Sequence, residues 1–298
     1  MKNKPSYATP AAFRRALTDR LMSLAAGSRW SLSQLQRQMA YDRLLERLYL
    51  LDDGWVVKGA TALLAREFGM RATIDVDVYR LQAPSAGETD LRSAVEQDIG
   101  DWFRFEIGPP RAGGEGQPGT RLPVTAYIGA TPWARFHVDL VDADLRMTGD
   151  PDPVPPLARI DMPGVEQHGY RAYPLADHLA DKVVATMQRY GGQGLPSTRF
   201  KDLVDLVAIV SGAELDAAKA RRALLSEADR RGVVLTTRFD VPDRGLWEGG
   251  YAAEAGRAVG RIPSTLNEAL AVVRPCLDGL LDGSAAGTWS PTTRRWEG

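Results

Sequence analysis

The chain has few of the residues that build covalent frameworks or soft-metal sites. Its 298 residues include one cysteine, Cys276, and three widely spaced histidines, His137, His168 and His178. A single cysteine excludes an internal disulfide framework and a cysteine-rich zinc site. The histidines form no His-x-x-x-His pair. Disulfide-stapled domains and zinc fingers are therefore excluded.

Long apolar runs and an excess of one charge are also missing. No apolar run reaches the ~18 residues that a membrane-spanning helix needs. The first residues, Met-Lys-Asn-Lys-Pro-Ser, lack the apolar segment of a secretory signal. The formal net charge is −1, so any contact with RNA must come from a local basic patch. We therefore expect a cytoplasmic globular protein that does not enter a membrane.

Residues 55–68 organise the rest of the chain. Trp55 to Val57 is short, apolar and typical of a strand, Gly59 breaks it, and Thr61 to Phe68 has the composition of a helix. The free N–H groups at such a helix start favour an anion. Lys58 would add positive charge, and the Thr61 hydroxyl would cap the helix or bind phosphate.

A second strand follows, from Thr73 to Tyr79, and it carries two carboxylates on one face. Asp75 and Asp77 are two residues apart, so they share a face while Val76 and Val78 take the other. Two like charges this close repel unless a cation neutralises them, and oxygen ligands suit Mg²⁺. A single Asp-x-Asp is more often a solvated strand face. The order glycine turn, helix and Asp-x-Asp nevertheless indicates phosphoryl or nucleotidyl transfer.

These motifs resemble a known family. Lys-Gly-Ala-Thr-Ala-Leu from Lys58, followed by Arg-x-Thr-x-Asp-x-Asp from Arg71, is similar to the AbiEii-like (MenT-like) nucleotidyltransferase toxins of the DNA polymerase β-type superfamily. The superfamily turn is Gly-Ser or Gly-Gly; here it is Gly-Ala, and Thr61 would supply the missing hydroxyl. The resemblance implies that the nucleoside triphosphate (NTP) is bound by Lys58, Gly59, Ala60, Thr61, Arg71, Thr73 and Lys182.

The superfamily also carries a third carboxylate on a later strand. Asp139 lies in the otherwise apolar strand 133–141, where a charge needs a partner or a metal. The resemblance assigns Asp139 as the third metal ligand beside Asp75 and Asp77, with Asp142 as the second choice. The alternative is that Asp139 is a strand-end residue or an ion pair with Arg135.

Two helical motifs complete the resemblance. Ala-Asp-Lys-Val-x-Ala, with Lys182, looks like the family's motif in which a lysine faces the nucleotide phosphates; the alternative is a lysine that snorkels at the surface. Arg-x-Lys-Asp-x-x-Asp-Leu, starting at Arg199, matches the motif whose first aspartate is in the site, which is Asp202. Asp205 would cap the helix or hold Arg199, and both carboxylates would also ease the helix dipole. The sequence leaves open which aspartate belongs to the site.

The predicted fold is mixed α/β (α+β), with a polymerase β-type core. Residues 1–150 form a nucleotidyltransferase lobe with a small mixed sheet and a helical lead-in, and residues 151–298 form a mainly helical lobe. The lead-in contains helices capped by Thr9 and by Ser31 or Ser33, and three arginines of the second helix, at 37, 43 and 47, are expected on its solvated face. Residues 144–165 are Pro-rich and predict a linker or a wrapping segment. Residues 283–298 are expected to be loose.

The predicted function follows from the resemblance. It is a Mg²⁺-dependent nucleotidyltransferase toxin, with Mn²⁺ as the other candidate ion, that belongs to a toxin–antitoxin or abortive-infection pair. It would transfer NMP from NTP to an RNA acceptor, the tRNA 3′ end, through catalytic Asp75, Asp77, Asp139, Lys182 and Asp202. Its partner would be a cognate antitoxin protein or regulation at the RNA level. A small-molecule or protein acceptor, which the near-neutral charge favours, and a non-catalytic binding protein are the alternatives.

Overall fold

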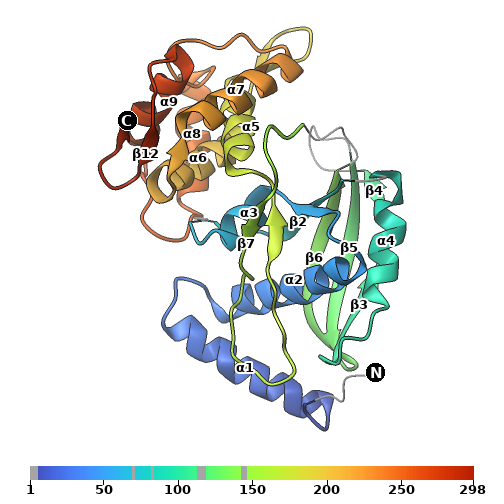
Figure 1. Cartoon of the computed structure of the whole chain (residues 1–298). Coiled ribbons are helices and arrows are strands. Elements are labelled where there is room, and N and C mark those ends of the chain that lie inside the picture. The colour runs from blue at the N-terminus through green and yellow to red at the C-terminus, as the bar shows by residue number, and fades with distance from the viewer. Residues whose placement is uncertain (1–5, 69–70, 82–83, 113–118, 142–145) are drawn as a thin grey trace. The chain divides into compact units, whose positions relative to one another are not determined.

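The computed structural model describes residues 6–68, 71–81, 84–112, 119–141 and 146–298 (Figure 1). Its contacts group into two compact units, each drawn from several stretches of the chain. The first unit comprises residues 1–65, 73–145 and 153–172, and the second comprises residues 66–72, 146–152 and 173–298. The domain division at residue 150 stays a prediction. In the described ranges, no helix has both the length and the apolar character needed to cross a membrane.

A mixed sheet forms the centre of the first unit, as predicted. Its strand order is β3-β5-β6-β2-β1-β8-β7, with β4 beside β5. Strand β2 pairs in parallel with β6 and antiparallel with β1, and β5 and β6 form an antiparallel hairpin. The strands are β1 (Trp55–Val57), β2 (Asp75–Arg80), β3 (Phe103–Ile107), β4 (Arg111–Ala112), β5 (Gly119–Ile128), β6 (Thr131–Val141), β7 (Asp152–Val154) and β8 (Tyr170–Ala172).

Helices pack on the apolar face of this sheet. Figure 1 shows α2 crossing the strands with α4 at its side. The Thr9 hydroxyl accepts a hydrogen bond from Ala12 N at the start of α1, and Ser31 and Gln34 form a capping box at the start of α2, so both predicted caps are confirmed. The helices are α1 (Pro10–Ala26), α2 (Leu32–Leu51), α3 (Gly59–Ala65), the 3₁₀ turn η1 (Pro84–Ala86) and α4 (Gly87–Val95).

The alternation of side chains in β2 and β6 separates a core face from a polar face. Val76 and Val78 are fully buried, as is Val138 on the neighbouring strand. Asp75 and Asp77 are half-buried on the opposite face. Burial of the β-branched face fixes the strand orientation, because a slip of one residue would turn the carboxylates into the core.

The Pro-rich segment is a wrapping segment, not a free linker. Its apolar side chains Val154, Ala158 and Met162 are buried in the core of the first unit. Asp42 on α2 anchors it, accepting hydrogen bonds from Leu157 N and Ala158 N at 2.8 Å and from the Tyr170 hydroxyl. Burial raises the pKa of Asp42 to about 6, although these hydrogen bonds oppose the shift.

Two arginines of α2 are buried, which corrects the expectation of a solvated face. Arg43 Nε lies 2.6 Å from Asp101 Oδ2, and Arg47 Nη2 lies 2.7 Å from Asp101 Oδ1. Each of the three side chains is at most 2% exposed. A buried guanidinium is tolerated because a carboxylate and backbone carbonyls satisfy its donors.

The second unit is mainly helical. Trp247 and Tyr251 of α8 are fully buried in it. Its helices are α5 (Leu175–Met187), α6 (Phe200–Gly212), α7 (Ala217–Arg231), α8 (Arg244–Ala255) and α9 (Leu266–Asp282). Its short strands are β9 (Arg189–Tyr190), β10 (Leu195–Pro196), β11 (Leu215–Asp216), β12 (Thr288–Ser290) and β13 (Arg295–Glu297).

The prediction that residues 283–298 are loose was wrong. Strand β12 pairs with both β11 and β13, so this segment forms a small sheet. Trp289 is fully buried, and its Nε1 donates to Val210 O at 2.9 Å. Trp296 adds a second anchor, because its Nε1 donates to Cys276 O of α9 at 3.1 Å.

Candidate functional site

The turn after β1 lies directly against Asp77. Lys58 N donates to Asp77 O at 2.8 Å, which ties the turn to β2. Gly59 adopts a left-handed φ of +58°, and a Cβ added there would lie 1.8 Å from Asp77 Oδ2. Only glycine meets both conditions. Helix α3 begins at Gly59, two residues earlier than predicted, and Ala60 is buried within it.

Hydroxyl groups in this region hold the start of β2. The Thr61 hydroxyl, predicted to cap the helix or bind phosphate, donates instead to Asp75 O at 3.1 Å, and Thr61 is fully buried. The Thr73 hydroxyl donates to the same carbonyl at 3.0 Å. Tyr41 of α2 donates in turn to Thr73 O at 3.0 Å. A hydroxyl carries one proton, so in this conformation neither threonine donates to a ligand.

Strand pairing places Asp139 beside the Asp-x-Asp pair. Asp77 is the register partner of Asp139 across the parallel pair β2–β6, and Asp75 is the partner of His137. The His137 Nδ1 lies 3.3 Å from Asp75 Oδ1. Asp142, the second choice for the third carboxylate, lies outside the described residues.

Asp139 has an ion-pair partner that the sequence reasoning missed. Arg121 of β5 contacts both of its oxygens, with Nε 2.8 Å from Oδ1 and Nη2 2.6 Å from Oδ2. The same Nη2 lies 3.6 Å from Asp75 Oδ1. The suggested partner Arg135 was therefore wrong. The hydrogen bond to Asp139 raises the pKa of Arg121, outweighing the effect of burial, and the charges of Asp75 and Asp77 add to it.

The donor chemistry at this face fits one hard cation. Asp75 and Asp77 offer carboxylate oxygens, the ligands that Mg²⁺ prefers, and the missing Cβ of Gly59 lets the Asp77 carboxylate lie against the backbone. Asp139 already accepts two hydrogen bonds from Arg121. Across the described part of the chain, no group of three or more His, Cys, Asp or Glu side chains has an arrangement that would hold a metal ion. Because the Arg121 guanidinium uses both oxygens of Asp139, the geometry fits two carboxylate ligands better than three.

Lys182 lies in a second charged cluster, within the second unit. Its side chain is 5% exposed, so it is not a snorkelling surface lysine. The Nζ lies 2.6 Å from Asp205 Oδ2 and 3.0 Å from Asp202 Oδ1. Burial lowers the pKa of Lys182, but the attraction of the two carboxylates outweighs it, and the net shift is upward.

The two aspartates of α6 have different arginine partners. Asp202 pairs with Arg199, and Asp205 accepts from Arg71 Nε and Nη2 at 3.0 Å each. Asp205 therefore holds Arg71, not Arg199 as the sequence suggested. Arg71, predicted to bind NTP, uses its guanidinium on this carboxylate. Burial raises the pKa of Asp205, but Lys182 and Arg71 lower it more strongly, so its pKa lies well below the usual range.

The structure thus brings the predicted residues into two groups. Within the first unit, Gly59, Asp75, Asp77 and Asp139 lie together, and Arg121 joins them. The second unit assembles Arg71, Lys182, Asp202, Asp205 and Arg199. The assignment of catalytic, NTP-binding and metal-binding roles to these residues remains a proposal.

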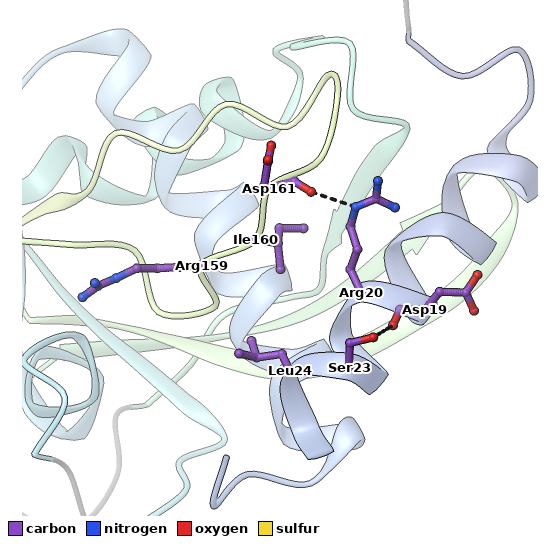
Figure 2. Close-up of a pocket in the computed structure, with 7 residues that line it drawn as sticks. All are labelled: Asp19, Arg20, Ser23, Leu24, Arg159, Ile160 and Asp161. Carbon is purple, nitrogen blue, oxygen red and sulfur yellow. Dashed lines mark hydrogen bonds between the residues drawn. The ribbon is translucent and has the colours of Figure 1, made fainter. Parts of the chain in front are cut away.

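A surface pocket of the first unit shares no residue with either group. Figure 2 shows the residues that line it, on α1 and on the wrapping segment. Its volume is about 380 Å³. Arg20 Nε donates across it to Asp161 O at 2.8 Å. It is lined by Asp19, Arg20, Ser23, Leu24, Arg159, Ile160 and Asp161, none of which was predicted as a site residue.

Comparison with known proteins decides the family. The family model described as nucleotidyl transferase AbiEii toxin of type IV toxin–antitoxin systems matches residues 43–272, which is more than half of the chain. The chain belongs to this family. It is therefore a nucleotidyltransferase toxin of a type IV toxin–antitoxin system, and the alternative of a non-catalytic binding protein is set aside.

A solved structure supports the fold of this AbiEii toxin. MenT4, a nucleotidyltransferase toxin from Mycobacterium tuberculosis, matches with a TM-score of 0.50 and 18% identity over 90% of this chain and 88% of that one. JHP933 from Helicobacter pylori matches with 14% identity and a TM-score of 0.45 over 83% of this chain and 92% of that one. No curated protein sequence matches.

Proposed function

We propose that this AbiEii toxin transfers NMP from NTP to an RNA acceptor, the tRNA 3′ end, with Mg²⁺ held by Asp75 and Asp77. Mn²⁺ would serve as a substitute ion. The observation that carries the proposal is the fit between Gly59 and Asp77, since a Cβ at residue 59 would lie 1.8 Å from the carboxylate. This close fit supports the proposal because it holds the Asp77 carboxylate against the turn at residues 58–60, where the proposal places the triphosphate.

The residues of the first unit would bind and orient the triphosphate. A divalent ion on Asp75 and Asp77 would neutralise phosphate charge and polarise the reacting phosphoryl group. The first N–H groups of α3, at residues 59–61, have no acceptor inside the helix and would donate to phosphate oxygens. Lys58, half-buried at the same turn, would add positive charge. Asp139, held by Arg121, would complete the acidic face.

Lys182 and Asp202 form the second part of the proposal. A lysine beside the leaving pyrophosphate would stabilise the charge that develops there. In the structure the Lys182 ammonium is shared by Asp202 and Asp205. Binding of a phosphate group would therefore require Lys182 to exchange one carboxylate partner for phosphate oxygens, with Asp205 kept in place by Arg71.

The choice of acceptor and partner rests on the family resemblance. The net charge of −1 implies that RNA would be bound by a local surface, not by the whole molecule. A cognate antitoxin, acting as a protein or at the RNA level, would restrain the toxin. The same near-neutral charge is compatible with a small-molecule or protein acceptor, so the test must separate these acceptors.

The test uses each labelled NTP in turn, with total tRNA, with a mixture of small-molecule acceptors, or with neither. We expect label on tRNA, complete loss with EDTA, and at least a hundredfold loss in Asp77→Ala. Asp150→Ala, which changes an exposed aspartate, is the matched control and should keep full transfer. Label that appears only on small molecules or on protein would refute the RNA acceptor. Full transfer by Asp77→Ala would refute the site itself.

A further inference from the structure

We propose that Arg121 is a built-in cation of this site, which holds Asp139 so that the acidic face binds one divalent ion, on Asp75 and Asp77, and not two. The inference rests on the metal-binding part of the proposed function. It assigns a role to a residue outside all the recognised motifs.

The first argument is the geometry of the pair. Arg121 and Asp139 are direct register partners on neighbouring strands. Two parallel hydrogen bonds of 2.8 and 2.6 Å join them, one to each carboxylate oxygen. Such fork-to-fork pairs are strong and orient both partners. A metal bound to Asp139 would therefore compete with a guanidinium that already uses both oxygens.

The second argument is the charge of the cluster. Arg121 Nη2 lies 2.6 Å from Asp139 Oδ2 and 3.6 Å from Asp75 Oδ1, so it sits between two of the three carboxylates. Asp75, Asp77 and Asp139 carry three negative charges, and Arg121 returns one positive charge. The remaining charge of −2 is what one divalent ion neutralises.

The third argument is the side from which Arg121 approaches. The Asp77 carboxylate lies against the backbone of Gly59, which follows β1, whereas Arg121 belongs to β5, on the other side of β2 in the sheet. The arginine side chain is 29% exposed and Asp139 is 19% exposed, so the pair is accessible enough to be tested by substitution without opening the core. Arg121 is thus a positioning residue that sets the number of ions.

The experiment counts Mn²⁺ ions bound per chain by electron paramagnetic resonance and by calorimetry, without nucleotide, so that the result does not depend on turnover. We expect one ion in the wild type and two in Arg121→Gln, since both oxygens of Asp139 then become available as ligands. Arg121→Lys, which keeps the charge, should bind one. Arg104→Gln, which breaks an exposed pair with Glu106 on another strand of the same sheet, is the matched control and should also bind one.

Each outcome either supports or overturns the inference about Arg121. Two ions in the wild type, or one in a folded Arg121→Gln, would overturn the inference while leaving the proposed metal dependence intact. No bound ion in the wild type would instead refute the metal part of the proposed function. If Arg121→Gln fails to fold, the double variant Arg121→Gln/Asp139→Asn removes both partners. It should bind one ion within about threefold of the wild-type affinity; a tenfold loss would show that Asp139 is a ligand.

Discussion

The charged cluster around Lys182 makes a sharp prediction about stability. Its members alternate in sign in the order Arg71, Asp205, Lys182, Asp202 and Arg199, and each contacts its neighbours in this series. The net charge of the five side chains is +1. The substitution Asp205→Asn raises this net charge to +2. The substitution Lys182→Met lowers it to zero and leaves each carboxylate with its own arginine. The aspartate change should therefore cost more stability than the lysine change.

The magnitudes follow from burial. Asp205 and Lys182 are 1% and 5% exposed, so removing Asp205 leaves two cations without their closest partner. Breaking a buried pair in this way costs roughly 3–5 kcal/mol, whereas replacing a charge by an apolar group of similar size costs much less when the rest stays balanced. We expect about 2 kcal/mol or less for Lys182→Met.

The assay is urea unfolding at pH 7, monitored by circular dichroism. The free energies of unfolding are compared only if the variants have the same dependence on urea concentration. Arg104→Gln, at an exposed pair, should change the free energy of unfolding by less than about 1 kcal/mol. A larger loss in Lys182→Met than in Asp205→Asn would refute the charge-balance reasoning.

A comparison of the wild type with Asp205→Asn at different pH values gives a second test. The pKa of Asp205 is lowered in the folded state, so its stabilisation is fully present above its unfolded value of 3.8 and is lost as the pH falls below that value. The difference between wild type and Asp205→Asn should therefore be constant from pH 7 to about 5 and then shrink by roughly 1.4 kcal/mol per pH unit below pH 4. A difference that is constant down to pH 3 would contradict the assigned shift.

Three further predictions concern other sites. Gly59→Ala should abolish nucleotidyl transfer and weaken Mn²⁺ binding, because the new Cβ would displace the Asp77 carboxylate, whereas Gly192→Ala, whose Cβ meets nothing within 4 Å, should change neither. The pKa of Asp42 is raised to about 6, so its stabilisation is present at low pH and is lost as the pH rises through 6. Lowering the pH from 7 to 5 should therefore increase the stability of the wild type relative to Asp42→Asn by about 1 kcal/mol in urea unfolding, and an unchanged difference would contradict it. Trp289→Ala should lower the free energy of unfolding by roughly 3–5 kcal/mol by the same assay, and a loss below about 1 kcal/mol would show that β12 does not anchor the second unit.

Local features of the structure were predictable from the sequence. Thr9 and Ser31 mark helix starts because their side chains bond to the first free N–H groups, and both caps are observed. The alternation in 75–79 places two aspartates on one face because side chains in a strand alternate. The segment 283–298 was misjudged because composition did not reveal that two tryptophans, Trp289 and Trp296, bond to the backbone of α6 and α9.

Long-range partners were harder to predict. The register of the β5–β6 hairpin shifts at a bulge between Ala126 and Tyr127. Without this shift, Arg121 would lie opposite Val138 and face the core; with it, Arg121 lies opposite Asp139. The burial pattern of β6 reveals this bulge, since Trp133 and Phe136 are both buried although they are three residues apart. Strict alternation cannot give that spacing.

The burial of charged side chains was equally hard to predict from the sequence. Arg43, Arg47 and Lys182 are spaced in the sequence like ordinary solvated residues, and their carboxylate partners lie 20 to 58 residues away. Sequence periodicity reports which face of a helix is apolar, but a buried ion pair depends on which segment packs there. The resemblance to a family was needed to draw attention to Lys182.

The sheet formed by β11, β12 and β13 has a practical consequence for anyone who shortens this chain. Trp289 donates a hydrogen bond to the end of α6, and the first half of that helix carries Asp202 and Asp205. A truncation before residue 288 looks harmless on paper because it removes a short, mainly polar segment that contains no helix. It would nevertheless remove the hydrogen bond to Val210 O and destabilise the helix that carries two residues of the charged cluster. Loss of activity in such a shortened protein would therefore say nothing about the chemistry of the missing segment.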